Sequence, residues 1–358
     1  MSYTWMAART GATTSRLPAD PAVGLPDLTS VLTKHGLDGV VEEPLRHDGW
    51  SGAQLTRLTR GDGRRFVLKR DSLARDWIAR VTGDAPILRE AQLVAAAPAL
   101  PAPVRLPHLA AARDGDEVVL VMPDLTGTLL TWEAPVDAAS VDRVIGALAA
   151  LHGAPWHAAL PGDFAWTDLR KRVLLLTRRA AAGYEEDGNP VGERFRLGWD
   201  AFDRRAPTAA RRLVDDLTSD PEPILRALDR LPRAGLHGDL KLGNVGPAAD
   251  GSVDVIDWQM TLVAPVAVEL GWFLVCNVAG LPMAPDALLE RYRIAAALPD
   301  DDAWATQRDL ALVVGLLLRG WRKGLDAEAG VTLPTGASAT DDLAWWASEA
   351  VAAAARRL

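Results

Sequence analysis

The fold of this chain is decided by one stretch, residues 236–258, which reads LHGDLKLGNVGPAADGSVDVIDW. A cluster of Pro, Ala, Asp and Gly at 247–251 separates two short apolar segments, so the pattern predicts two strands joined by a turn. Because a hairpin brings its two ends together, Asn244 at the entry and Asp257 at the exit should lie side by side.

These two side chains carry oxygen atoms of the kind that Mg²⁺ prefers. Mg²⁺ binds few protein oxygens and completes its coordination with waters and phosphate oxygens. Asp239 precedes Asn244 by five residues, near enough to face the same phosphate without being a metal ligand. The stretch therefore predicts a site for a metal-bound nucleotide phosphate beside a carboxylate that can act as a base.

The spacing His237-x-Asp239-x4-Asn244, followed by Asp257 between Ile and Trp, resembles the catalytic loop and metal-binding segment of the protein-kinase-like fold. Its His-Gly-Asp and Ile-Asp-Trp forms are similar to those of the aminoglycoside phosphotransferase and small-molecule kinase family. The resemblance implies that Asp239 is the catalytic base and that Asn244 and Asp257 hold Mg²⁺. It also implies that His237 braces the loop. A surface hairpin with incidental acids is the alternative.

The same resemblance implies an α+β fold with two lobes, an antiparallel sheet in the N-lobe and a mostly helical C-lobe. We expect a lead-in and helix over 1–38, a nucleotide-binding N-lobe over 39–123, and a C-lobe over 124–358. The C-lobe would hold the catalytic loop, the metal site and the acceptor pocket. A chain of 358 residues is long enough for two lobes with a sizeable core.

The N-lobe should begin with a small sheet. The pattern predicts strands at 45–50, 54–59 and 65–70. The first turn carries Ser51 and Gly52, whose backbone N–H groups, with that of Ala53, can donate to phosphate where a kinase places its glycine-rich loop. The turn departs from the full G-x-G-x-x-G pattern, and an ordinary hairpin is the alternative.

Lys69 ends the third of these strands, and Glu90 follows in a helical segment. A lysine at such a position is usually solvated. In the family, however, the lysine reaches the α- and β-phosphates and is held by a helix glutamate. Ile87, Glu90 and Val94 recur at helical spacing, so Glu90 can point toward the sheet. Since a buried carboxylate without a partner is costly, we predict an ion pair between Lys69 and Glu90.

Two further strands are predicted at 105–113 and 117–122, and a breaker at 123–127 follows them. By order along the chain, this strand end corresponds to the kinase hinge, where backbone groups hold adenine. Pro123 lacks an N–H group. The adenine contacts should therefore fall on the backbone around Met122 and Asp124.

The C-lobe contains three features that bear on the site. The segment 165–231 predicts surface helices, which in related kinases help to build the acceptor pocket. Glu269 stands where the family commonly has an Asp that hydrogen-bonds the catalytic loop. Lys241, two residues after Asp239, either neutralises charge on the γ-phosphate during transfer or is an exposed loop lysine.

Composition excludes several classes of protein. The net charge of −8 argues against nucleic acid or an anionic membrane as a partner. The single cysteine, Cys276, lies in an apolar segment and provides neither a disulfide framework nor a thiolate metal site. No apolar run is long enough to span a bilayer, and the first residues lack the apolar core of a secretory signal. We therefore expect a cytoplasmic protein.

These observations predict an enzyme that transfers the γ-phosphoryl group of ATP, bound with Mg²⁺, to a hydroxyl of a small molecule. Aminoglycosides, amino sugars and other amines or polyols fit as acceptors. A carboxylate-rich pocket between 165–231 and the C-terminal helix would suit an amine, unless arginines of the insert pair with those acids. The alternatives are a catalytically silent nucleotide-binding regulator and, with less support, a protein kinase.

Overall fold

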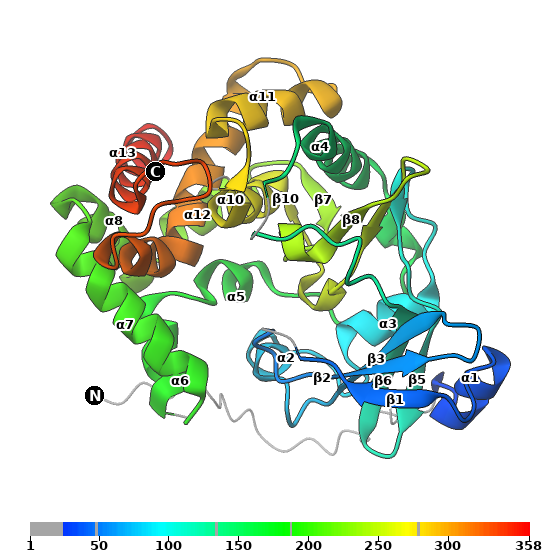
Figure 1. Cartoon of the computed structure of the whole chain (residues 1–358). Coiled ribbons are helices and arrows are strands. Elements are labelled where there is room, and N and C mark those ends of the chain that lie inside the picture. The colour runs from blue at the N-terminus through cyan, green and yellow to red at the C-terminus, as the bar shows by residue number, and fades with distance from the viewer. Residues whose placement is uncertain (1–23, 47–48, 133–134, 187, 278–279) are drawn as a thin grey trace.

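The computed structural model of the chain describes residues 24–46, 49–132, 135–186, 188–277 and 280–358. Two parts are evident in Figure 1: a sheet with three short helices, drawn in blue to cyan, and a larger, mostly helical part. The second part also carries two small sheets beside its helices. This is the mixed α+β arrangement that the sequence predicts.

The N-lobe sheet has five antiparallel strands in the order β1-β2-β3-β6-β5. Its strands are β1 (Val41–Pro44), β2 (Gln54–Thr59), β3 (Arg65–Asp71), β5 (Ala110–Asp114) and β6 (Glu117–Pro123). Alternate side chains of β3 enter different clusters: Leu68 packs on one face of the sheet and Val67 on the other. Both faces of the central strands are therefore buried, which explains their continuous apolar sequence.

Three helices cover this sheet: α1 (Leu28–Lys34), α2 (Trp77–Thr82) and α3 (Arg89–Ala96). Asp27 caps α1 by accepting the N–H of Ser30 at 2.9 Å. Leu28 and Val31 of α1 are buried against the sheet residues Leu58 and Phe66. The helix expected within 1–38 thus packs on the sheet as part of the N-lobe core.

Two strand predictions were wrong. The described residues of the range 45–50, which are 45, 46, 49 and 50, do not belong to a strand. The first strand is β1, and since all four of its residues are exposed it has no alternating pattern to detect. The strand predicted at 105–113 is two strands, β4 (Val104–Arg105) and β5, because Pro107 between them cannot donate to a ladder. Moreover, β4 leaves the N-lobe sheet and pairs in parallel with β9 (Val253–Val255) of the C-lobe.

The C-lobe is built around a long buried helix, α12, which packs against α7, α10 and α13. Its segment 310–318 is buried throughout, as the apolar sequence predicts. Asp301 caps it by accepting the N–H of Trp304 at 2.9 Å. The helices of this lobe are α4 (Ala138–Gly153), α5 (Leu169–Leu174), α6 (Arg178–Glu186), α7 (Pro190–Arg205), α8 (Thr208–Ser219), α9 (Glu222–Asp229), α10 (Val266–Asn277), α11 (Pro285–Ala295), α12 (Asp302–Glu328) and α13 (Ala339–Arg357).

Short strands of the C-lobe hold residues 236–258 in place. They are β7 (Arg233–Leu236), β8 (Val245–Pro247), β9 (Val253–Val255) and β10 (Leu262–Pro265). β8 and β9 form the predicted hairpin, in which Val245 lies opposite Val255. β7 pairs with β10, so the loop after β7 is held beside this hairpin.

Five aromatic rings, which we call the aromatic bridge, join the two lobes: Trp50, Trp77, Tyr184, Phe195 and Trp321. The centroid of Trp50 lies 5.6 Å from that of Phe195 and 5.8 Å from that of Trp321. The indole N–H of Trp77 donates to the carbonyl of Trp50 at 2.7 Å. The segment before β2 is therefore fastened to α2, α7 and α12.

In the part of the chain that the structure describes, no helix has the length and apolar character required to cross a membrane.

Candidate active site

The loop after β7 is held in place by His237, whose side chain is fully buried. The Nδ1 atom of its ring accepts the N–H of Asp239 at 3.1 Å, and Nε2 donates to the carbonyl of Ile256 at 2.9 Å. Its ring also packs edge-on against Trp258, with centroids 4.7 Å apart. These contacts tie the loop to the β8-β9 hairpin, which is the geometry that a bracing residue requires.

Glu269 of α10 holds the same loop from the other side. Its carboxylate accepts the N–H of His237 at 3.0 Å and that of Gly238 at 2.6 Å. His152 lies 2.9 Å from the same group. Burial alone would raise the pKa of Glu269, but the contacts from His152 and the loop outweigh it and lower that pKa. The expected contact between Glu269 and the loop is therefore present.

Gly238 explains why this loop has the His-Gly-Asp form. Its φ of +85° lies in the left-handed region that favours glycine. A Cβ atom at this position would lie 2.0 Å from the carbonyl oxygen of Met260. No other residue fits here without moving the backbone of Met260.

Asp239, Lys241 and Asn244 form one cluster at the end of this loop. The Lys241 ammonium lies 2.6 Å from the Asp239 carboxylate. Burial would lower the pKa of Lys241, but the Asp239 and Asp257 carboxylates outweigh it and raise that pKa. The amide nitrogen of Asn244 donates to the carbonyl of Asp239 at 2.9 Å, so its amide oxygen remains for another partner.

The hairpin brings Asn244 and Asp257 together as the sequence predicts. The N–H of Ile256 donates to the carbonyl of Asn244 at 3.1 Å. Asp257 itself has a φ of +69°, a left-handed conformation that is uncommon for residues other than glycine. Such backbone strain gathers at functional sites, where the surrounding structure fixes the residue.

Lys69 connects this hairpin to the N-lobe. Its ammonium lies 2.6 Å from Glu90 of α3, so the predicted ion pair is confirmed. It also lies 2.7 Å from Asp257, a contact that the sequence did not predict. Burial would lower the pKa of Lys69, but the two carboxylates raise it well above its usual range. Lys69 therefore stays charged between one acid of each lobe.

Comparison with known proteins agrees with this geometry. Residues 44–309 match the model of the phosphotransferase enzyme family. The chain belongs to this family. No significant match occurs among curated protein sequences.

Solved structures of related folds resemble this phosphotransferase over most of its length. A choline/ethanolamine kinase family protein from Mesorhizobium loti is 16% identical, with a TM-score of 0.51, over 91% of this chain and 97% of that one. A putative aminoglycoside phosphotransferase from Ralstonia eutropha is 14% identical, with a TM-score of 0.50, over 92% and 99%. These likenesses show the protein-kinase-like fold that the sequence implies.

The segment before β2 differs in part from its predicted role. The N–H of Ala53 donates to the Ser51 hydroxyl at 3.3 Å. This donor was expected to bind phosphate, but it is already engaged. Gly52 has a φ of +100°, and a Cβ atom there would lie 3.2 Å from the carbonyl oxygen of Arg75. A phosphate contact from the backbone of Ser51 and Gly52 stays a prediction.

The structure bears on one group of the predicted hinge, the N–H of Asp124. Met122 is buried near the end of β6, opposite Val67 of β3. The N–H of Asp124, however, is donated to the carbonyl of Arg65 at 3.0 Å, and its carboxylate lies 2.8 Å from Arg57. The N–H of Asp124 is therefore already engaged and is not available to adenine in this structure. The role of Met122 stays a prediction.

Asn244 and Asp257 fit Mg²⁺ only if phosphate completes the site. Across the described residues, no group of three or more His, Cys, Asp or Glu side chains is arranged to hold a metal ion. Two oxygen donors are too few for a resident ion, but they suit Mg²⁺ that arrives with a nucleotide.

Some of the acids expected around the acceptor pocket are engaged; the expected acids are Asp163, Asp168, Glu185, Glu186, Asp187 and Asp200. Glu185 and Asp200 lie 2.9 and 3.1 Å from Arg196. Asp168 caps α5 by accepting the N–H of Lys171 at 3.0 Å. Asp187 is outside the described residues. These contacts favour the alternative in which the acids of the insert are neutralised.

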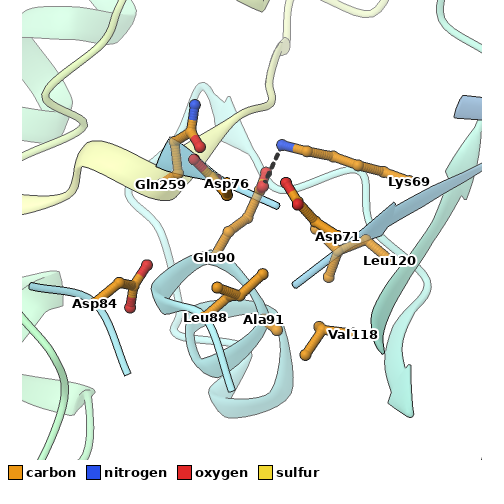
Figure 2. A pocket seen from close by; sticks show the side chains of 10 residues that line it. All are labelled: Lys69, Asp71, Asp76, Asp84, Leu88, Glu90, Ala91, Val118, Leu120 and Gln259. Atoms are coloured by element: carbon orange, nitrogen blue, oxygen red, sulfur yellow. Dashed lines mark hydrogen bonds and ion pairs between the residues drawn. The ribbon is translucent and has the colours of Figure 1, made fainter. Parts of the chain in front are cut away.

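A group of buried acids lies behind the pair of Lys69 and Glu90. Figure 2 shows Glu90 pointing from α3 toward Lys69, with the carboxylates of Asp71 and Asp76 beside that pair and Asp84 farther off. Burial raises the pKa of Asp71 to about 6 and that of Asp76 to about 7, and the Asp71 charge adds to the effect on Asp76. Sequence patterns did not predict this group, because Asp71 ends a strand, Asp76 caps a helix and Asp84 follows that helix, so no single period places them together.

We expect Asp76→Asn to change how stability depends on pH. A carboxyl group whose pKa is higher in the folded state binds more protons when folded, so the parent loses stability as pH rises from about 4 to 7. Asparagine carries no charge and can still cap α2, where Asp76 accepts the N–H of Ala79 at 3.0 Å. The free energy of unfolding of the variant should exceed that of the parent by on the order of 1–3 kcal/mol at pH 8, and by less at pH 5.

Urea unfolding across this pH range measures the effect. Asp116→Asn, in the exposed turn between β5 and β6, is the matched control. Its free energy of unfolding should depend on pH as that of the parent does. Parallel pH profiles for the parent and Asp76→Asn would exclude the raised pKa.

Proposed function

We propose that this protein transfers the γ-phosphoryl group of Mg-ATP to a hydroxyl group of a small molecule. The proposal is supported chiefly by the continuous set Glu90, Lys69 and Asp257, which joins the two lobes beside Asn244 and Asp239. Phosphoryl transfer requires a cation for the phosphates, oxygen ligands for a metal ion and a base, and these residues carry such groups. Membership of the phosphotransferase family supports the same conclusion.

Lys69 and the hairpin would hold the nucleotide. Glu90 fixes the Lys69 ammonium, which would bind phosphate oxygens as a positively charged donor. Asn244 and Asp257 would hold Mg²⁺, which when bound neutralises charge on the phosphates. Asp257 would then share its carboxylate between Lys69 and the ion. Ser51, Gly52 and the backbone of Met122 are the further nucleotide contacts that we propose.

Asp239 would receive the proton of the acceptor hydroxyl. Its carboxylate is mostly buried on a loop that His237 and Glu269 hold rigidly, so the hydroxyl can be oriented for in-line attack. As the oxygen–phosphorus bond forms and the bond to the leaving ADP breaks, the proton passes to the Asp239 carboxylate. Lys241, beside that carboxylate, would offset negative charge on the transferring group.

Acceptor-dependent release of ADP tests this function. The purified protein is incubated with Mg-ATP and a panel of hydroxylated small molecules and peptides. We expect at least one small molecule to be phosphorylated on oxygen, with mass spectrometry locating the phosphate. ATP binding without acceptor-dependent turnover would favour a silent regulator. Turnover with peptides alone would favour a protein kinase.

A further inference from the structure

Two buried hydrogen-bond donors next to the loop lack an acceptor. They are Nη1 of Arg172, from α5, and the indole Nε1 of Trp272, from α10. Both residues are almost fully buried, with exposed fractions of 1% and 6%. The guanidinium carbon of Arg172 lies 4.8 Å from the centre of the Trp272 ring. Buried donors usually have an acceptor, so these two contacting side chains are candidates to bind the oxygen atoms of a ligand.

These donors lie close to the proposed base. Nε of Arg172 donates to the carbonyl of Gly238 at 2.8 Å, one residue before Asp239. Among the described residues, no carboxylate lies within 4.0 Å of the Arg172 guanidinium. Burial lowers the pKa of Arg172, although the more distant charges of Asp239 and Glu269 oppose this. A buried cation without a close counter-ion is costly unless a ligand supplies one.

More unpaired positive charge lies nearby on α7 and α12. The guanidinium carbon of Arg319 lies 5.6 Å from the same Trp272 ring, and that of Arg194 lies 4.7 Å from the Trp50 ring. Burial, together with the charges of Arg322 and Arg319, lowers the pKa of Arg194. Within the described part of the chain, neither Arg194 nor Arg319 has a carboxylate within 4.0 Å.

Some other arginines of the insert and of α12 are paired with acids. Arg178 lies 2.6 Å from Asp203, and Arg170 contacts Glu222. Arg322 lies 2.9 Å from Asp326, which offsets part of the charge on that face. Arg172, Arg194 and Arg319 therefore leave positive charge without a close carboxylate on α5, α7 and α12. In Figure 1, α5 lies between α12 and the N-lobe, in the region that an acceptor must enter.

We propose that the acceptor is an anion: a hydroxylated compound whose carboxylate or phosphate group binds at Arg172 and Trp272 while its hydroxyl faces Asp239. Arg319 and Arg194 form the outer part of this site. The inference rests on the proposed function. Guanidinium and indole N–H groups match anionic oxygens in charge and hydrogen bonding, whereas an ammonium group would be repelled. Both inner atoms are closed to solvent, so neighbouring side chains must shift when the anion binds.

Binding of matched compounds tests the charge preference directly. Gluconate, sorbitol and glucamine share a carbon chain but are anionic, neutral and cationic, and a sugar phosphate series separates phosphate from carboxylate. Calorimetric titration in the presence of Mg²⁺ and a non-hydrolysable ATP analogue should show an anionic member binding at least about tenfold more tightly than its analogues. Equal or tighter binding of the neutral or amine analogues would overturn the inference. Absence of binding by every anion at millimolar concentration would overturn it as well.

Substitutions assign the site to these arginines. Arg319→Gln should weaken binding of the preferred anion about tenfold and retain binding of the Mg-nucleotide. Arg204→Gln is the matched control, since Arg204 pairs on the surface with Glu328 at 2.7 Å, and it should leave both affinities unchanged. Arg172→Lys keeps the charge but loses the planar guanidinium, whose separate nitrogen atoms can donate to the Gly238 carbonyl and to an anion. If that variant does not fold, Arg319→Gln decides; unchanged anion affinity in Arg319→Gln would contradict the site.

The indole N–H of Trp272 gives an independent readout. In protein labelled with ¹⁵N-tryptophan, its resonance is assigned by its loss in Trp272→Phe. The resonance should shift when gluconate or the preferred sugar phosphate binds, and no shift at saturation would exclude contact with Trp272. Because these titrations involve no phosphoryl transfer, anion binding without turnover would refute the proposed function alone. Turnover confined to amines would refute only this inference.

Discussion

Asp239→Asn should lower kcat by on the order of 10²–10⁴-fold and leave the affinity for Mg-ATP nearly unchanged. The proposed role of Asp239 is to accept a proton from the acceptor, and it is not expected to hold the nucleotide. Asparagine has nearly the same shape and can still accept a hydrogen bond from Lys241, but it cannot take up a proton at neutral pH. Steady-state ADP release and calorimetric titration with Mg-ATP measure the two quantities.

Asp116→Asn again provides the matched control, because it changes an exposed carboxylate to an amide far from the loop. Equal urea unfolding curves for both variants would show that the fold is intact. A kcat for Asp239→Asn equal to that of the parent would refute the role of this residue as base. A parallel loss of nucleotide affinity would indicate that Asp239 acts on the metal-bound phosphate.

Asp257→Ala should weaken Mg-ATP binding by about 10–100-fold, the effect of losing one or two charge-assisted contacts. The change removes the carboxylate that we propose as a ligand of the ion, and with it one of the two acids beside Lys69. Asn244→Ala should have the same direction but a smaller effect, because an amide oxygen holds a cation less strongly than an ionised carboxylate.

Titration with ATP in the presence of EDTA separates the two roles of Asp257. Without Mg²⁺, the variant should bind ATP at least as well as the parent, since Lys69 is released from one acid and stays fixed by Glu90. Mg-ATP affinity equal to that of the parent would exclude Asp257 as a metal ligand. A similar loss with and without Mg²⁺ would show that its role is to position Lys69.

The parts of the site that follow local patterns could be predicted from sequence. The β8-β9 hairpin has a clear turn, so the meeting of Asn244 and Asp257 needed only hairpin geometry. Lys69 and Glu90 follow from a continuous apolar strand and from a segment with helical spacing. The contact of Glu269 with the loop required the family resemblance, because nothing near it in sequence indicates its partner.

The remaining contacts depend on tertiary packing that no local pattern encodes. Arg172 lies in a run of basic residues, which usually indicates a solvated helix face, yet its side chain is buried against Gly238 and Trp272. The contact of Lys69 with Asp257 crosses between lobes and depends on how α3 and the hairpin are placed. The parallel pairing of β4 with β9 likewise joins segments that are distant in sequence.

The aromatic bridge has a consequence for the order of events in a turnover. Trp50 precedes the strand that leads to Lys69, and its ring packs on Phe195 and Trp321, from helices that flank the proposed acceptor region. Separating these rings exposes apolar surface to water, which costs a free energy of roughly 25 cal/mol for each Å² exposed. Where binding of one substrate displaces these rings, it changes access for the other, and we therefore expect a compulsory sequence of binding and release. Product-inhibition patterns of a random mechanism would show that the bridge does not impose this order.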